Sequence, residues 1–139
     1  MSLSDAVQSI ASLATAIGVG LAAWQLRVTK QQAQSEFEDG LNEQYRKIAA
    51  RIPLAALLGR PLDDDELTSS LRAFYDYFDL SNEQAFLHTH GRVRSETWQN
   101  RCEGIQQHLC RPAFRGAWDR LLPDLDGSFE DLRQLIAQR

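Results

Sequence analysis

The stretch AVQSIASLATAIGVGLAAWQL, residues 6–26, decides how this chain is organised, because none of its side chains is charged. As a helix its 21 residues would be about 31 Å long, close to the roughly 30 Å thickness of a membrane's hydrocarbon core. Every other stretch of that length in the 139-residue chain contains charged residues. The sequence therefore predicts an N-terminal transmembrane helix within residues 1–26, followed by a polar body.

Two other interpretations of this run compete with a membrane span. A secretory signal peptide has a positive segment before its apolar core, but no Lys or Arg precedes Arg27 and no clear cleavage site follows. A buried helix of a soluble bundle is the stronger competitor, since Ser, Thr and Gln dilute the run. The span is favoured because the charge-free run ends at Trp24, Arg27 and Lys30, residues typical of a membrane boundary.

The charges beside the run predict its orientation. Arg27 and Lys30 follow it directly, whereas Asp5 is the only charged side chain before it. Positively charged residues next to a span are enriched on the cytoplasmic side. We therefore expect a single-pass protein with its N-terminus outside the cytoplasm and residues 27–139 within it.

The run has two different faces when it is drawn as a helix. The bulky face consists of Ile10, Leu13, Ile17, Leu21 and Trp24, and the small or polar face of Gln8, Ala11, Ser12, Thr15, Gly18, Ala22 and Gln25. The series Ala14-Gly18-Ala22 and Ser12-Ala16-Gly20 are typical of helices that associate in lipid, although Ala and Gly are common in membrane helices generally. We expect a homo-oligomer or a protein partner. A ring of such helices, lined by Gln8, Ser12, Thr15 and Gln25, would form a pore.

The body, residues 27–139, shows helical periodicity and no sustained alternation of period two. Residues 27–52 predict a stalk-like first helix that continues the apolar run and ends before Pro53. Its apolar stripe is expected to contain Phe37, Leu41, Tyr45, Ile48 and Ile52. The fold class predicted is all-α: a transmembrane helix that continues into a small cytoplasmic bundle of about four to five helices.

Four consecutive acids, Asp63 to Glu66, precede the next apolar-patterned stretch. They lack the spacing of a calcium loop, and acids in a first helical turn interact favourably with the helix dipole. We expect them to begin a helix whose segment FYDYF, residues 74–78, forms the thickest part of the core, and we expect Gly91 to end it.

Capping residues predict the later helices. Ser95 is expected to cap one helix, and Ser128 to cap the last one, with Asp131 at the spacing of a capping box. Pro112 suits the first turn of a helix between them.

Charge and cysteine content restrict the partners and the compartment. The net charge is −4 and no basic stripe is present, so no nucleic-acid partner is expected. Cys102 and Cys110 lie eight residues apart on one predicted helix, about 12 Å, which exceeds the ~7 Å Cα limit for a disulfide. We expect a free pair of buried thiols in a reducing compartment.

No catalytic, cofactor-binding or metal-binding residue is predicted. Phosphate-binding loops, zinc-protease motifs and hydrolase triads have no counterpart in this sequence. His88 and His90 come closest to a metal pair, but residues two apart on a helix point about 200° apart and no third ligand lies near them in sequence. The sequence favours a protein that is not an enzyme.

One pair of residues supports an alternative in which the protein is an enzyme. Arg101 and His108 match the R-x4–6-H pattern of the HEPN ribonucleases, where Arg and His act on an RNA phosphate. A match is expected by chance at this composition, and Cys102 replaces the polar residue usual after the Arg. A membrane-tethered ribonuclease is thus an alternative to the interpretation of Arg101 as a surface residue and His108 as a boundary residue.

Three stretches of the region from Phe74 to Trp118 are distinctive: YDYFDLSNEQAFL, GRVRSETWQNRCEGI and RPAFRGAW, residues 75–87, 91–105 and 111–118. In these stretches the chain resembles a group of small bacterial inner-membrane proteins, some of them named phage abortive infection proteins. This resemblance implies one N-terminal span, a helical cytoplasmic domain and a setting in phage defence, and it supplies no catalytic residues. The function expected is a membrane-anchored module that self-associates or docks a partner; the alternatives are a pore-forming oligomer and the ribonuclease.

Overall fold

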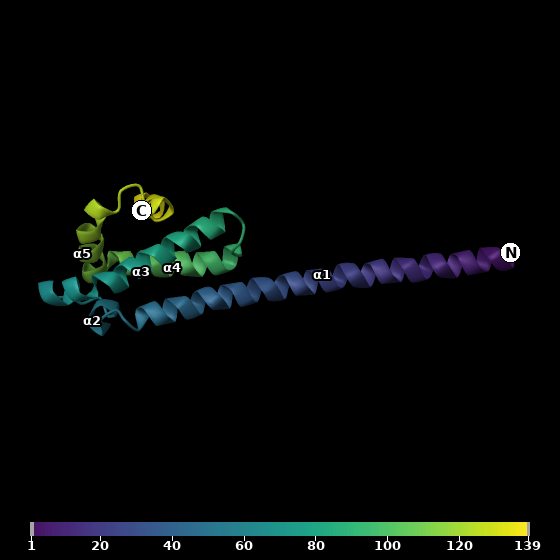
Figure 1. The fold of residues 1–139 in the computed structure, drawn as a ribbon, viewed down its shortest axis with the longest axis horizontal. Coiled ribbons are helices and arrows are strands. Elements are labelled where there is room, and N and C mark those ends of the chain that lie inside the picture. The colour runs from purple at the N-terminus through teal and green to yellow at the C-terminus, as the bar shows by residue number, and fades with distance from the viewer. Residues whose placement is uncertain (1, 139) are drawn as a thin grey trace. The chain divides into compact units, whose positions relative to one another are not determined.

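The computed structural model describes residues 2–138, and this part of the chain is helical, without a strand (Figure 1). The predicted all-α class and the long apolar N-terminal helix are confirmed. Within residues 2–138 six α-helices and one 3₁₀ helix follow one another: α1 (Leu3–Ala49), α2 (Leu54–Leu57), α3 (Asp64–Thr89), α4 (Ser95–Cys110), α5 (Pro112–Leu121), η1 (Leu122–Asp124) and α6 (Glu130–Ala137).

The chain divides into two compact units. We call Met1–Phe37 the N-terminal unit and Glu38–Arg139 the helical domain. The division falls inside α1 and inside residues 27–52, the segment that the sequence assigns to a stalk. Because α1 is one uninterrupted helix, the prediction that the apolar run continues into the body without a break is confirmed.

The core of the helical domain is built around α3, which packs against α4, α5 and α6. Phe74, Phe78, Phe114 and Leu132 are fully buried. Phe74 meets Phe114 edge to face at 5.0 Å between ring centroids, a favoured geometry for aromatic pairs. The aromatic segment of α3 is therefore the centre of the core, as predicted.

Both ends of α3 confirm the sequence reading. Asp63 accepts a hydrogen bond from the Glu66 backbone N–H at 2.8 Å, and the Glu66 side chain accepts one from the Asp63 N–H, which completes a capping box. Gly91, just past the helix, has a φ of +68°, a left-handed conformation that favours glycine. The acidic run thus begins a helix.

Glu38, the first residue of the helical domain, is buried, and the predicted apolar stripe of α1 needs a correction at Phe37. Phe37 is 40% exposed, whereas Glu38 is only 5% exposed. The Glu38 carboxylate accepts hydrogen bonds from the Arg94 backbone N–H (3.2 Å), the Arg94 guanidinium (2.6 Å) and the Thr97 hydroxyl (2.9 Å). The Arg94 side chain is the main reason why the pKa of Glu38 lies below its ordinary value. The predicted place of Phe37 was wrong because these donors make burial of the acid favourable.

Two predicted helix caps are wrong. Arg94, not Ser95, is the N-cap of α4, and Phe129, with a left-handed φ of 59°, is the N-cap of α6 in place of Ser128; neither makes a side-chain cap hydrogen bond. Partners distant in sequence satisfy the free N–H groups instead. Glu38 accepts from Arg94, and the Asn82 side chain on α3 accepts from the Leu132 N–H at 3.0 Å.

The cysteines are free, as predicted, but they are not both buried. Cys102 is half-buried and Cys110, at the end of α4, is exposed. Burial raises the pKa of the Cys102 thiol. Cys110 is therefore a surface thiol of the helical domain.

Candidate functional site

The helical domain contains a pocket between the end of α1, the middle of α3 and one face of α4. Its volume is about 270 Å³. Every residue that lines it belongs to the helical domain. The lining residues are Asn42, Tyr45, Tyr77, Leu80, Ser81, Gln84, Asn100, Arg101, Gly104, Ile105 and His108.

Arg101 supplies the positive charge of this pocket. It is half-buried, and its guanidinium donates a hydrogen bond to the Asn42 side-chain oxygen. No carboxylate in the described part of the chain forms an ion pair with it, since the nearby Glu38 is already bonded to Arg94 and Thr97. Burial lowers the pKa of Arg101, and the negative charge of the nearby Glu38 offsets part of that effect.

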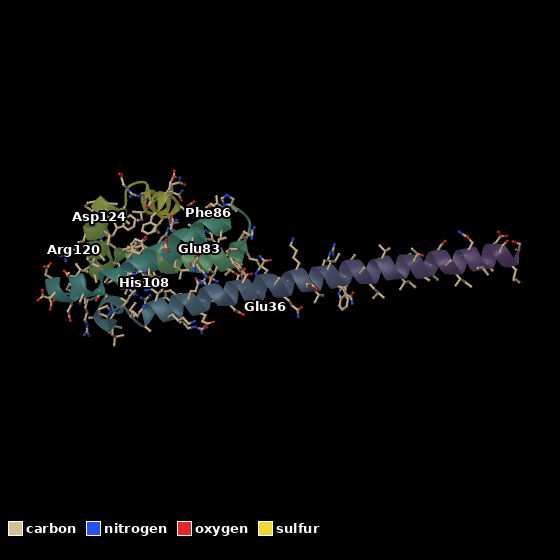
Figure 2. All side chains as sticks on the ribbon, viewed as in Figure 1. Glu36, Glu83, Phe86, His108, Arg120 and Asp124 are labelled. Atoms are coloured by element: carbon tan, nitrogen blue, oxygen red, sulfur yellow. The ribbon has the colours of Figure 1, made fainter. Side chains whose placement is uncertain are left out.

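His108 lies among aromatic rings at the other end of the pocket and is labelled in Figure 2. Its ring centroid is 5.4 Å from that of Tyr77, 6.4 Å from that of Tyr45 and 5.0 Å from that of Phe114. Burial lowers the pKa of His108, and the charge of Arg111 lowers it further. His108 is therefore a neutral imidazole at pH 7, with one donor and one acceptor nitrogen, and one of the two is hydrogen-bonded to the Gly104 backbone.

The α3 wall carries buried polar groups. Tyr77 is almost fully buried, and this burial raises the pKa of its hydroxyl, which keeps the group protonated. The Ser81 hydroxyl donates to the Tyr77 carbonyl at 2.8 Å. Gln84 is only 4% exposed, and its side-chain amide lines the pocket without a hydrogen bond to another residue within 2–138. The amide is not sealed from solvent, so a group that fills the pocket could pair with it in place of water.

The structure brings Arg101 and His108 onto one pocket, a placement that the sequence left open. Seven residues apart on α4, they share a helix face and lie about 10 Å apart along its axis. Both are half-buried: His108 lies at the boundary of the core, as expected, and Arg101 is a partly exposed residue at the pocket. Cleavage of RNA by this pair remains a prediction.

Sequence reasoning missed the residues that face this pair. Tyr77, Ser81 and Gln84 follow one another at helical spacing on α3. The sequence predicts Tyr77 within the core segment FYDYF and predicts no role in a site for Ser81 or Gln84. A polar line of that spacing inside an otherwise apolar face was the available signal. Asn42 lies among the charged residues of α1 and gives no signal, and Tyr45 belongs to the predicted apolar stripe, which indicates packing and not a site.

The two histidines considered for metal binding have separate surroundings. His88 stacks on Trp98, with ring centroids 4.9 Å apart, and its buried Nδ1 has no hydrogen-bond partner. His90 Nδ1 lies 2.9 Å from the Phe86 carbonyl oxygen. Within residues 2–138 no three His, Cys, Asp or Glu side chains gather closely enough to hold a metal ion.

The N-terminal unit is the second candidate site. An 18-residue window of α1 has a mean hydropathy of 1.6, and none of its residues is buried. In Figure 2 the side chains of this unit stand out from the helix along its length. The helix is long and apolar enough to cross a membrane.

Comparison of the chain with protein-family models, curated proteins and solved structures finds no match.

Proposed function

We propose that this protein is a single-pass membrane protein whose span associates with other spans and whose helical domain lies in the cytoplasm of a bacterium. The observation that carries the proposal is the exposure of the apolar window of α1. Leu13, for example, is 63% exposed, whereas a core helix of a soluble bundle would bury such residues. Lipid is the solvent in which an exposed apolar helix of this length is stable.

Charge supports the orientation. Arg27 and Lys30 follow the apolar run, and the positive-inside rule places that end in the cytoplasm. The resemblance of the region from Phe74 to Trp118 to bacterial inner-membrane proteins, some named for phage abortive infection, supports the same placement and a role in phage defence.

The small face of the span supports self-association. Gly18, on this face, costs helix stability, and a Cβ added to it would meet no atom of the described chain within 4 Å beyond its own helical backbone and neighbours. Nothing within residues 2–138 therefore requires glycine there, whereas a second helix approaching closely would.

Membrane placement can be tested with the native thiol Cys110, which is exposed at the end of α4. In bacterial spheroplasts we expect a membrane-impermeant maleimide to label Ser4→Cys at once, in a Cys102→Ser, Cys110→Ser background. The native Cys110 should be labelled only after permeabilisation. Cys110→Ser is the matched control. Recovery of the protein in the soluble fraction would overturn the anchor, and labelling of Cys110 in intact spheroplasts would overturn the orientation.

Self-association can be tested with one substitution placed on opposite faces of the span. Ala22→Leu adds bulk to the small face, and Ala6→Leu adds the same bulk on the side of the bulky stripe. In neutral detergent we expect a mass of two or more chains that falls to one chain for Ala22→Leu and is unchanged for Ala6→Leu. A monomeric native protein would overturn self-association and the pore alternative together; a ring of several chains that conducts ions would favour the pore.

A further inference from the structure

The pocket between α1, α3 and α4 has an unbalanced set of polar groups. Among its lining residues Arg101 is the only full charge at neutral pH, and none is an Asp or Glu. Gln84 adds an amide with no protein partner within residues 2–138. The walls are otherwise apolar or aromatic, with Tyr45, Tyr77 and His108 facing one another.

We propose that this pocket binds a small organic monoanion with a flat apolar body, of the aromatic carboxylate class. The Arg101 guanidinium would hold the carboxylate, since planar guanidinium and carboxylate groups match in geometry. The Gln84 amide would donate to the same ligand, and the rings of Tyr45, Tyr77 and His108 would enclose its body. The inference is independent of the membrane placement.

Gly104 leaves part of the pocket unfilled, because it lacks a side chain on the wall that α4 forms. It lies in the middle of α4 and lines the pocket, and a Cβ built on it meets no heavy atom within 4 Å. Glycine at such a position costs helix stability relative to alanine, and nothing in the described chain requires it there. A ligand in the pocket would occupy the space that a side chain at position 104 would otherwise fill.

Size restricts the ligand to a small molecule. About 270 Å³ is slightly below the usual range of drug-sized pockets and suits a single ring with one acidic group. A polynucleotide chain cannot be enclosed in that volume, and one cation would neutralise only one charge. The geometry therefore favours a carboxylate over an RNA strand.

The experiment is calorimetric titration of the full-length protein in a neutral maltoside detergent, with detergent micelles alone as the blank. The probes share one ring and differ in charge: benzoate, phenyl phosphate, benzyl alcohol and benzylamine. We expect benzoate to bind at least tenfold more tightly than benzyl alcohol, and benzylamine not to bind. Phenyl phosphate, which carries a second charge, should bind more weakly than benzoate.

Three variants locate the binding. Arg101→Met should weaken benzoate binding at least tenfold, Arg101→Lys should lose less, and Arg115→Met, which removes an exposed arginine from α5, should change nothing. Gly104→Leu should abolish binding while the thermal midpoint stays equal or rises, because the leucine fills the pocket. If Gly104→Leu does not fold, Gly104→Ala replaces it as the test. This smaller change should keep the fold and weaken benzoate binding.

Several outcomes would overturn the proposal. These are absence of benzoate binding at millimolar concentration, equal binding of benzoate and benzylamine, or benzoate binding that survives both Arg101→Met and Gly104→Leu. Tighter binding of phenyl phosphate would assign the pocket to phosphates instead. Cleavage of single-stranded RNA that is lost in Arg101→Ala and in His108→Ala would make the pair nucleolytic and would also overturn the carboxylate assignment.

Discussion

Helix α1 runs through both units of the protein, and the burial of its side chains differs between them. In the N-terminal unit Ile10, Leu13 and Ile17 are exposed, whereas in the helical domain Glu38 is buried. Hydropathy alone would predict the reverse. What decides burial is the set of partners: Glu38 finds Arg94 and Thr97, and the leucines and isoleucines of the N-terminal unit require a solvent that is itself apolar.

The largest expected effect is a loss of stability of the helical domain that leaves the N-terminal unit unchanged. Phe74→Ala removes a fully buried ring at the centre of the core and should cost about 3–5 kcal/mol of unfolding free energy. Phe86→Ala, on the same helix but exposed, is the matched control and should cost less than about 1 kcal/mol.

Tryptophan fluorescence during denaturation in detergent measures this difference. Trp24→Phe removes the signal of the N-terminal unit, so Trp98 and Trp118 report on the helical domain alone. Equal destabilisation by Phe74→Ala and Phe86→Ala would show that the core is not centred on α3.

A charge placed in the N-terminal unit should have the next largest effect. Ile17→Arg puts a guanidinium at the middle of the apolar run, where membrane insertion costs about 2.5–3.5 kcal/mol more. We expect a large part of the protein to move from the membrane pellet to the supernatant. Ser35→Arg adds the same charge beyond the run and should leave the protein in the pellet. No difference between the two variants would contradict the span.

A pH-dependent effect should appear where the helical domain begins. Because the folded pKa of Glu38 lies below its ordinary value of 4.5, its carboxylate stabilises the fold above that pH and loses this contribution as the pH falls through the folded pKa. At pH 7 Glu38→Gln should cost about 1–2 kcal/mol, because it exchanges charge-assisted hydrogen bonds for neutral ones.

Denaturation at pH 7 and at pH 3 tests this sign. The difference between the native protein and Glu38→Gln should shrink at low pH, where the native side chain becomes neutral too. Glu36→Gln, an exposed acid of the N-terminal unit labelled in Figure 2, is the control and should show no difference at either pH. A gap that stays constant would mean that the Glu38 charge does not stabilise the fold.

The sequence predicts the helices well, but it predicts poorly which residues of different helices contact one another, and the reason is physical. Helices such as α3 are encoded locally: apolar spacing sets the face, Asp63 begins the helix and Gly91 follows its end. The pocket depends instead on residues such as Tyr45, Gln84 and Arg101, which come from three helices. Only their packing brings these residues together: in the sequence Tyr45 belongs to an apolar stripe, and Gln84 and Arg101 look like ordinary polar residues of their helices.

The smallest expected effect concerns such a long-range partner. The sequence assigns the cap of α6 to Ser128, whereas the structure gives the Leu132 N–H to the side chain of Asn82. Asn82→Ala should therefore cost about 1 kcal/mol of unfolding free energy, as loss of a helix cap does, and Ser128→Ala should stay within about 0.5 kcal/mol of the native protein.

Chemical denaturation of both variants in the Trp24→Phe background measures the two costs. The comparison is informative because Ser128 is adjacent to α6 in sequence, whereas Asn82 is adjacent to it in space. A larger cost for Ser128→Ala would mean that α6 is capped locally. A larger cost for Asn82→Ala would show that α3 holds α6 through a hydrogen bond as well as through apolar contact. In that case the polar residues of the α3 segment Asn82-Glu83-Gln84 act inside the domain: Asn82 at a helix end and Gln84 in the pocket wall.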